Sequence, residues 1–293
     1  MDTSLIIPGI IFGLSIGSIY FLMAIGLSLC FGLMRVISLD QLLYYSVGGY
    51  ITYTISLYTG SFWLGVLAAV VVGGIVSLAI ERIVFRRIYE RDLTFSMITS
   101  FGVLLGGVGI IKFFWGLIPR PVPVPINAQL NILGTDVPIY RLVVIFVAIA
   151  VYIAIWLFLN RTIIGKAIRA GIESPDQVQG LGINIRRIFT ITFVVASGLA
   201  GFGGCLHSPL VGVRPYMGFD MLLLAFITVI LGGLGSLKGT LISAAILGQV
   251  ISVGGTLYSP LSSVGPFLVM FIVILLKPTG LYGIKGKAFG FEE

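Results

Sequence analysis

Long uninterrupted apolar stretches decide which folds are open to this chain. Two of them, Leu64–Ile80 and Leu142–Leu159, approach the ~20 residues that a helix needs to cross a lipid bilayer. Of the 293 residues 58% are hydrophobic and only 10% are charged, more apolar surface than a soluble fold of this size can bury. Transmembrane barrels show ~10-residue segments of alternating polarity instead. The sequence therefore predicts an all-α, polytopic transmembrane helical bundle.

The apolar pattern predicts nine candidate spans within a single transmembrane domain that covers residues 1–293. The stretches before and after residues 233–238 are short, so residues 220–257 form either two crossings or one re-entrant hairpin. We therefore expect about eight or nine spans. The candidate spans are approximately 8–32, 42–58, 62–81, 94–115, 140–159, 188–210, 220–236, 239–257 and 264–277.

The basic residues predict how the bundle is oriented, because Lys and Arg gather in cytoplasmic loops. Segments 81–92 and 160–187 are both basic, and the two spans between them allow both to lie on the same side. This arrangement places fourteen of the 18 Lys and Arg residues inside and four outside. The N-terminus is then expected outside and the C-terminus in the cytoplasm. The net charge of +7 thus belongs to cytoplasmic loops and gives no reason to expect nucleic-acid binding.

The longest outside segment, Gly116–Ile139, contains four prolines within Pro119–Pro125. Proline at that density prevents helix formation and favours an extended, partly rigid strip. Two interpretations stay open: a plain connecting loop, or part of a docking face for an extracytoplasmic partner.

Glycines at helical spacing predict close helix packing. Gly9, Gly13 and Gly17 fall on one face of the first span, and Gly102 and Gly106 fall on one face of the fourth. Small faces of this kind let helix backbones approach each other in a membrane. They indicate a tightly packed polytopic bundle.

The sequence contains no recognisable catalytic or metal-binding set. A single histidine, His207, excludes sites that need several imidazoles, and we interpret it as an interfacial or helix-bonded residue. Cys30 and Cys205 lie in apolar helical stretches and are expected to be packing residues. No phosphate-binding loop is present, so this chain is not expected to bind and split ATP.

The inside segment of about residues 160–187 is unusually long for a helix connection. Ser174, Pro175 and Asp176 form a good helix start, with a cap, a proline in the first turn and an acid near the N-terminus. The short helix predicted over Asp176–Leu181 ends at Gly182. It is either a docking element at the cytoplasmic surface or a solvated amphipathic loop.

Several motifs, taken in chain order, resemble those of branched-chain amino-acid ABC transporter permeases. The similarity is closest to the H-type permease of the leucine/isoleucine/valine system, which urea-type importers also resemble. It spans nearly the whole chain. The matching motifs are Gly17–Tyr20 with Ala24–Leu27, Glu81-Arg82 with Phe85-Arg86, Gly165–Ala170, Pro175-Asp176, Leu181–Asn184, Leu231–Ser236 with Gly239, and Lys277–Leu281.

The resemblance implies an inner-membrane permease that pairs with a homologous second permease or a second copy, two cytoplasmic ATPases and a periplasmic solute-binding protein. ATP and Mg²⁺ are then expected in the ATPases, with no cofactor on this chain. The inside segment would act as the coupling helix that seats in an ATPase groove. The residues that the resemblance places in this coupling region are Glu173, Ser174, Pro175, Asp176, Gln177 and Gly182.

One departure from the family pattern concerns the segment after the first span. Family members commonly read Asn-Phe-Ala-His-Gly where this chain reads Ser38-Leu39-Asp40-Gln41-Leu42. An acid between two apolar runs is costly unless it is hydrated or partnered. If the segment is a membrane-buried break, Ser38, Asp40 and Gln41 are candidates for the solute pathway, with Asp40 facing an ammonium and Gln41 a carboxylate. If it is a cytoplasmic turn, Asp40 is a solvated acid near Arg35.

The sequence thus predicts a non-enzymatic transport subunit that moves an amino acid or a related small polar solute by alternating access. The alternative is a self-sufficient secondary carrier or channel. Few ionisable residues lie within the spans to form a proton relay, which disfavours that alternative.

Overall fold

The computed structural model describes residues 3–34, 36–88, 92–132, 135–173, 175–180 and 182–283. Within these ranges the chain is a helical bundle with one short β-hairpin, which confirms the predicted all-α class. The helices are α1 (Thr3–Met34), α2 (Gln41–Thr59), α3 (Phe62–Ile83), α4 (Leu93–Trp115), α5 (Ile139–Arg161), α6 (Ile163–Glu173), α7 (Pro175–Gly180), α8 (Ile185–Val211), α9 (Met217–Gly232), α10 (Leu237–Leu257) and α11 (Leu261–Leu276), with a single 3₁₀ turn, η1, at Phe85–Arg87.

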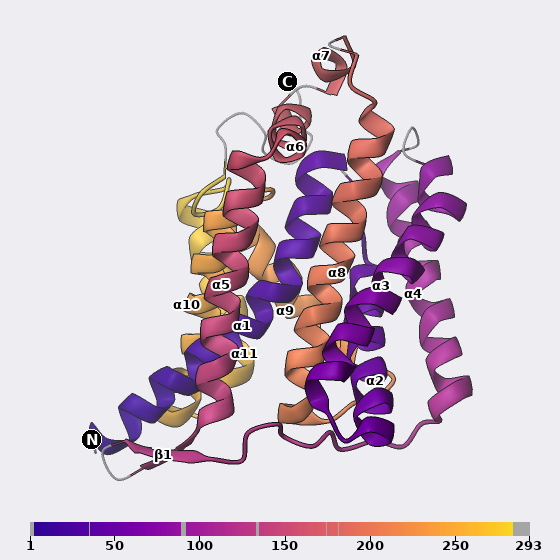
Figure 1. Ribbon diagram of the computed structural model, residues 1–293. Coiled ribbons are helices and arrows are strands. Elements are labelled where there is room, and N and C mark those ends of the chain that lie inside the picture. The colour runs from indigo at the N-terminus through magenta and orange to yellow at the C-terminus, as the bar shows by residue number, and fades with distance from the viewer. Residues whose placement is uncertain are drawn as a thin grey trace.

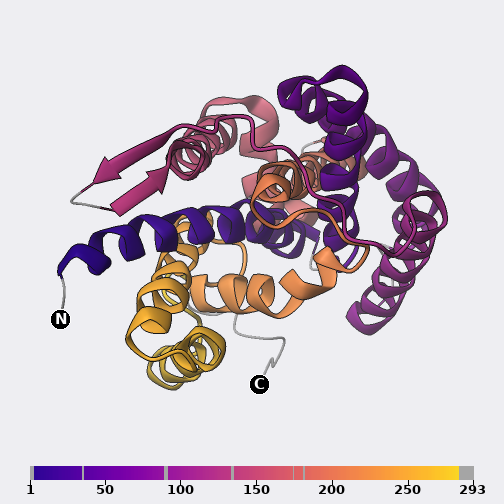
Figure 2. The same cartoon turned by 90° about the horizontal axis from the view of Figure 1, so that it is seen from below.

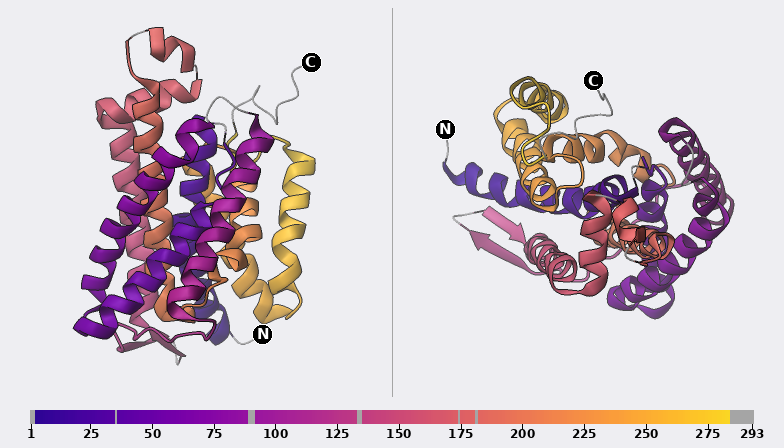
Figure 3. Two further views of the ribbon diagram at one scale, coloured as in Figure 1. Left: turned by 90° about the vertical axis from the view of Figure 1, so that its right-hand side faces the viewer. Right: turned by 90° about the horizontal axis from the view of Figure 1, so that it is seen from above.

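The long helices run side by side between two distinct ends (Figure 1). At one end lie α6 and α7, and α7 projects beyond every other helix (Figure 3). At the other end lies the hairpin of β1 (Gln129–Ile132) and β2 (Thr135–Pro138), whose register pairs Leu130 with Val137. We call these the α7 end and the hairpin end.

All nine predicted spans coincide with helices to within a few residues. Among the described residues, six helices are long and apolar enough to cross a membrane: α1, α3, α4, α5, α8 and α10. Helices α9 and α11 are apolar but shorter. The chain is therefore a multi-pass membrane protein, while the predicted total of eight or nine crossings and the orientation of the termini stay predictions.

Close glycine contacts hold α1 at the centre of the bundle. A methyl group on Gly17 would stand 2.6 Å from the carbonyl oxygen of Ala244 in α10, so the two backbones touch as the glycine spacing predicts. The matching prediction for α4 was wrong within this chain. Gly102 and Gly106 face no other part of the described structure, and Gly107 packs against Leu43 instead.

The proline-rich segment Gly116–Ile139 is extended around its prolines, as predicted, and crosses the hairpin end of the bundle (Figure 2). It is fixed at Arg120, whose backbone exchanges two hydrogen bonds with Val213, of 2.9 and 2.8 Å. The hairpin that follows was not predicted, because two four-residue strands give too short an alternation to recognise.

The segment of about residues 160–187, predicted to lie inside, contains two helices where one was predicted. The short helix was placed correctly as α7, and Gly182 after it has a positive φ of 78°. The preceding α6 was missed. It is amphipathic: Ala167, Ile168 and Gly171 are buried while Lys166 and Arg169 are exposed.

Candidate functional site

The connection between α1 and α2 lies inside the bundle and not at its end. Ser100 Oγ in α4 donates to the carbonyl oxygen of Ile37 at 2.9 Å, and Gln41 Nε2 donates to Ser197 Oγ in α8 at 3.3 Å. Ser197 is twelve residues into the 27-residue α8, or roughly 18 Å along it at 1.5 Å per residue. Gln41 is therefore near mid-depth, and α2 occupies mainly the half of the bundle nearer the hairpin (Figure 1).

The three predicted pathway residues lie together and are buried. The exposed fractions of Ser38, Asp40 and Gln41 are 1%, 0% and 0%. Ser38 Oγ donates a hydrogen bond to Asp40 Oδ1, and Gln41 Nε2 also lies 3.5 Å from Cys30 Sγ. Of the two interpretations left open by the sequence, the structure therefore supports a buried break over a solvated turn. Arg35, the suggested partner of Asp40 in a turn, lies outside the described residues.

The polar atoms of this group are incompletely satisfied. Asp40 Oδ2, Gln41 Oε1 and the Tyr44 hydroxyl have no hydrogen-bond partner among the described residues. The Tyr44 hydroxyl lies beside the Asp40 carboxylate and interacts with it electrostatically. Since most buried polar groups in folded proteins are hydrogen-bonded, this concentration within one helical turn is unusual.

Helix capping does not explain Asp40. It stands at the N-cap of α2, a position where a carboxylate commonly accepts a bond from the first-turn backbone. Here its side chain makes no such bond. The positive end of the α2 dipole favours an anion at this place. It provides no hydrogen-bond donor for Asp40 Oδ2.

An apolar pocket of about 60 Å³ adjoins the polar group. Ser38 belongs to both: its hydroxyl bonds Asp40, and the residue lines the pocket. The other lining residues come from α1, from the break and from α9 with its following turn. They are Leu27, Phe31, Ile37, Phe226, Val229, Ile230 and Leu234.

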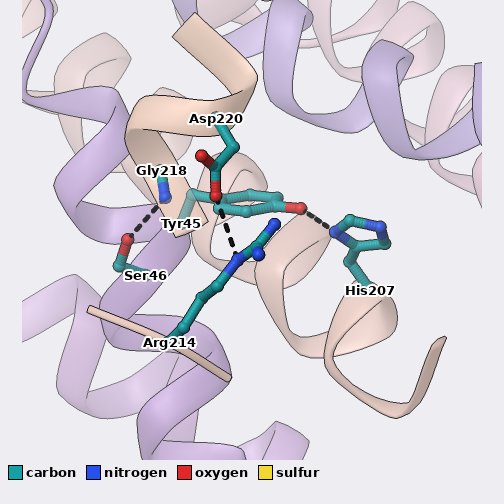
Figure 4. A network of polar contacts seen from close by, with 6 residues as sticks. All are labelled: Tyr45, Ser46, His207, Arg214, Gly218 and Asp220. Atoms are coloured by element: carbon teal, nitrogen blue, oxygen red, sulfur yellow. Dashed lines mark hydrogen bonds and ion pairs between the residues drawn. The ribbon is translucent and has the colours of Figure 1, made fainter. Parts of the chain in front are cut away.

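A second set of polar contacts involves residues of α2 and α8 and of the segment that leads into α9 (Figure 4). Arg214 forms an ion pair with Asp220 at 3.0 Å, and the Gly218 backbone N–H donates to Ser46 Oγ at 3.1 Å. The hydroxyl of Tyr45 in α2 hydrogen-bonds to His207 Nδ1 in α8. His207 is thus a helix-bonded residue, as predicted, and its bond ties α8 to α2.

The predicted coupling residues lie at the α7 end, far from the break. Glu173 ends α6, Pro175, Asp176 and Gln177 begin α7, and Gly182 follows it. Ser174 lies outside the described residues. The helix start predicted there is thus present, with Pro175 as the first residue of α7.

Both cysteines are free and buried, as expected for packing residues. The described part of the chain contains no group of three or more His, Cys, Asp or Glu that could hold a metal ion.

Sequence reasoning missed three members of the buried group: Cys30, Tyr44 and Ser197. Tyr44 could have been found, because it stands four residues after Asp40 on the same helical face. Ser197 gave no such signal, since only the packing of α8 against α2 brings it to Gln41.

Comparison with known proteins gives one consistent result. A family model described as the permease component of branched-chain amino acid transport systems matches residues 9–275. The high-affinity branched-chain amino acid transport system permease protein LivH of Escherichia coli (strain K12) is 27% identical over 289 residues, covering 92% of this chain and 93% of LivH. LivH of Salmonella typhimurium is 26% identical over 287 residues, with the same coverage. BraD of Pseudomonas aeruginosa, with the same description, is 28% identical over 287 residues, covering 92% of this chain and 94% of BraD.

Proposed function

Because this chain belongs to the family of permease components of branched-chain amino acid transport systems, we propose that it is the membrane-spanning subunit of an ABC importer. It moves branched-chain or other amino acids, or a related small polar solute, across a bacterial-type inner membrane by alternating access. It is a transport subunit and not an enzyme.

One observation supports a solute pathway through this chain more than any other: the buried break at Val36–Asp40. Irregular backbone at membrane depth is tolerated where it is buried in protein or lines a cavity, and transporters place their substrate sites at such interrupted helices. Here the break carries Ser38 and Asp40, Gln41 follows it as the first residue of α2, and a pocket adjoins the group.

The α7 end supports coupling to an ATPase. Helix α7 projects beyond the bundle (Figure 3) and is flanked by exposed basic residues such as Arg169 and Arg187. We assign Glu173, Ser174, Pro175, Asp176, Gln177 and Gly182 to the contact with an ATPase groove. The α7 end then faces the cytoplasm, and the hairpin end faces outward.

The chain requires partners for this function. They are a homologous second permease or a second copy, two cytoplasmic ATPases that hold ATP and Mg²⁺, and an extracytoplasmic solute-binding protein. The absence of a phosphate-binding loop from the sequence supports placing nucleotide chemistry in another subunit.

Purification from the native membrane tests this function. An affinity-tagged chain should bring ATPase subunits with it, and the reconstituted complex should take up an amino acid only when ATP is present on the α7 side. Uptake by the isolated chain along a solute or ion gradient would show a secondary carrier or channel and contradict the proposal.

A further inference from the structure

The Asp40 carboxylate is buried in mid-bundle, and no cation among the described residues pairs with it. The exposed fraction of Asp40 is 0%. Ser38 satisfies Oδ1, while Oδ2 has no partner. Ionisable residues at such depth are rare in membrane proteins and mark solute or ion pathways.

The unsatisfied atoms around Asp40 define what would satisfy them. A carboxylate oxygen and an amide oxygen accept hydrogen bonds, and a tyrosine hydroxyl both accepts and donates. Asp40 Oδ2 and Gln41 Oε1 therefore need donors, and the Tyr44 hydroxyl can accept a further one. A primary ammonium group carries three N–H donors, no acceptor and a positive charge. A carboxylate or phosphate would instead repel Asp40.

The neighbouring pocket restricts the rest of the ligand. Seven of its eight lining residues are apolar, and the eighth is Ser38, whose hydroxyl donates a hydrogen bond to the Asp40 carboxylate. A ligand that places an alkyl group in the pocket can therefore have a carbon next to Ser38, the residue that the pocket shares with the polar group. An ammonium on that carbon reaches Asp40 when it displaces the Ser38 hydroxyl from Oδ1 or approaches Oδ2.

We propose that Ser38, Asp40, Gln41 and Tyr44 form a subsite for the ammonium group of the transported solute, whose alkyl substituent lies in the adjoining pocket. The solute is then an aliphatic amine or an amino acid with an aliphatic side chain, and its amine is required for recognition. This assignment rests on the proposed transport function and specifies which group of the solute this chain recognises.

Three probes that share one alkyl group test the subsite on the purified complex without nucleotide. They are leucine, 3-methylbutylamine, which lacks the carboxylate, and 4-methylpentanoate, which lacks the amine. A ligand that binds only the folded state raises the midpoint of thermal unfolding. Leucine and the amine should raise it, and 4-methylpentanoate should not. Equal stabilisation by the acid and the amine, or none by any probe, would overturn the subsite.

Asp40→Asn removes the charge and keeps the shape and the Ser38 hydrogen bond, so the fold should persist. It should weaken binding of the amine at least tenfold, and Tyr44→Phe should weaken it less. Asp92→Asn is the matched control. Asp92 also stands at a helix N-cap without a side-chain capping hydrogen bond, but it is exposed. Unchanged amine binding in Asp40→Asn overturns the proposal. Thermal stabilisation by Na⁺ that depends on Asp40, with Na⁺ not displaced by the amine, also overturns it.

The uptake assay separates this proposal from the function on which it rests. If the complex shows no ATP-dependent uptake of any amino acid, the transport function fails. If uptake is ATP-dependent but the same in Asp40→Asn as in the unmodified complex, the function stands and the ammonium subsite fails. The expected result is ATP-dependent uptake that falls at least tenfold in Asp40→Asn.

Discussion

Gly204 of α8 lies directly against the carbonyl oxygen of Tyr45 in α2, so closely that a methyl group added to Gly204 would overlap that oxygen. This contact sets the distance between two helices that together bury Gln41 and carry the hydrogen bond from Gln41 to Ser197. Helix separation here therefore controls the geometry of the buried break.

Gly204→Ala should destabilise the protein by about 1–3 kcal/mol, because α2 and α8 must move apart. Gly198 in the same helix is the matched control, since nothing lies within 4 Å of its added methyl group. Gly198→Ala should be neutral, or stabilising by roughly 0.5–1 kcal/mol through helix propensity. Thermal unfolding of the detergent-purified protein measures both. Equal effects of the two substitutions would show that the close contact does not constrain the helices.

A second prediction concerns Glu81, a buried acid near the α7 end of α3. Thr190 Oγ1 donates to Glu81 Oε1 at 2.9 Å. Thr190→Val keeps the size of the side chain and removes this donor, which should cost about 1.5–3 kcal/mol because the acceptor is a buried carboxylate. Unfolding in denaturant or by heat provides the measurement.

Thr192→Val is the control for that substitution. Thr192 is buried in the same helix, but its hydroxyl donates only to the carbonyl oxygen of Ile188 in the preceding turn. Since such a bond contributes little to a helix, the loss should stay within roughly 0.5 kcal/mol. A Thr192→Val effect as large as that of Thr190→Val would mean that burial, and not the bond to Glu81, explains the result.

A third prediction concerns the orientation of the bundle. Asn127 lies in the exposed segment at the hairpin end, and Gln179 is exposed on α7. Single cysteines at these positions should react with a membrane-impermeant thiol reagent from opposite sides, Asn127→Cys from outside. Cys30 and Cys205 are replaced by alanine beforehand, although both are buried. Labelling of both positions from one side would contradict the predicted arrangement of crossings.

A fourth prediction concerns energy coupling through α7. Replacing Asp176 and Gln177 with alanine should lower ATP-driven uptake at least tenfold while the complex keeps its basal ATP hydrolysis. Assembly should persist, because these residues stand at the far end from the core of the bundle. Uptake and hydrolysis are measured on the same reconstituted sample.

A double variant at the hairpin end is the control for the α7 variant. It replaces one acid, Asp136, and one amide, Asn131. Their side chains hydrogen-bond to each other at 2.9 Å. Replacing both with alanine removes the same two functional groups at the opposite end and should leave the ratio of uptake to hydrolysis unchanged. If the α7 variant also keeps that ratio, α7 is not the coupling element.

The sequence alone determined the long helices. A long apolar run such as Leu142–Leu159 leaves helix as the conformation that satisfies its own backbone in lipid, so α5 follows from local composition. The start of α7 was equally local, since a proline in the first turn and an acid beside it act within one turn. The amphipathic α6 was missed because its eleven residues lie in a charged segment that reads as a loop.

Tertiary structure alone decided the environment of Asp40. Between two apolar runs, the same five residues could form a hydrated turn or a buried break, and both have the same local pattern. The choice depends on how deep α2 begins, which is set by contacts with α4 and α8 through Ser100 and Ser197, residues far away in the sequence. Burial is a property of everything that packs around a residue, whereas periodicity reports only the residue's neighbours along the chain. The sequence could therefore identify Asp40 as unusual, and only the packed helices could show that it is buried.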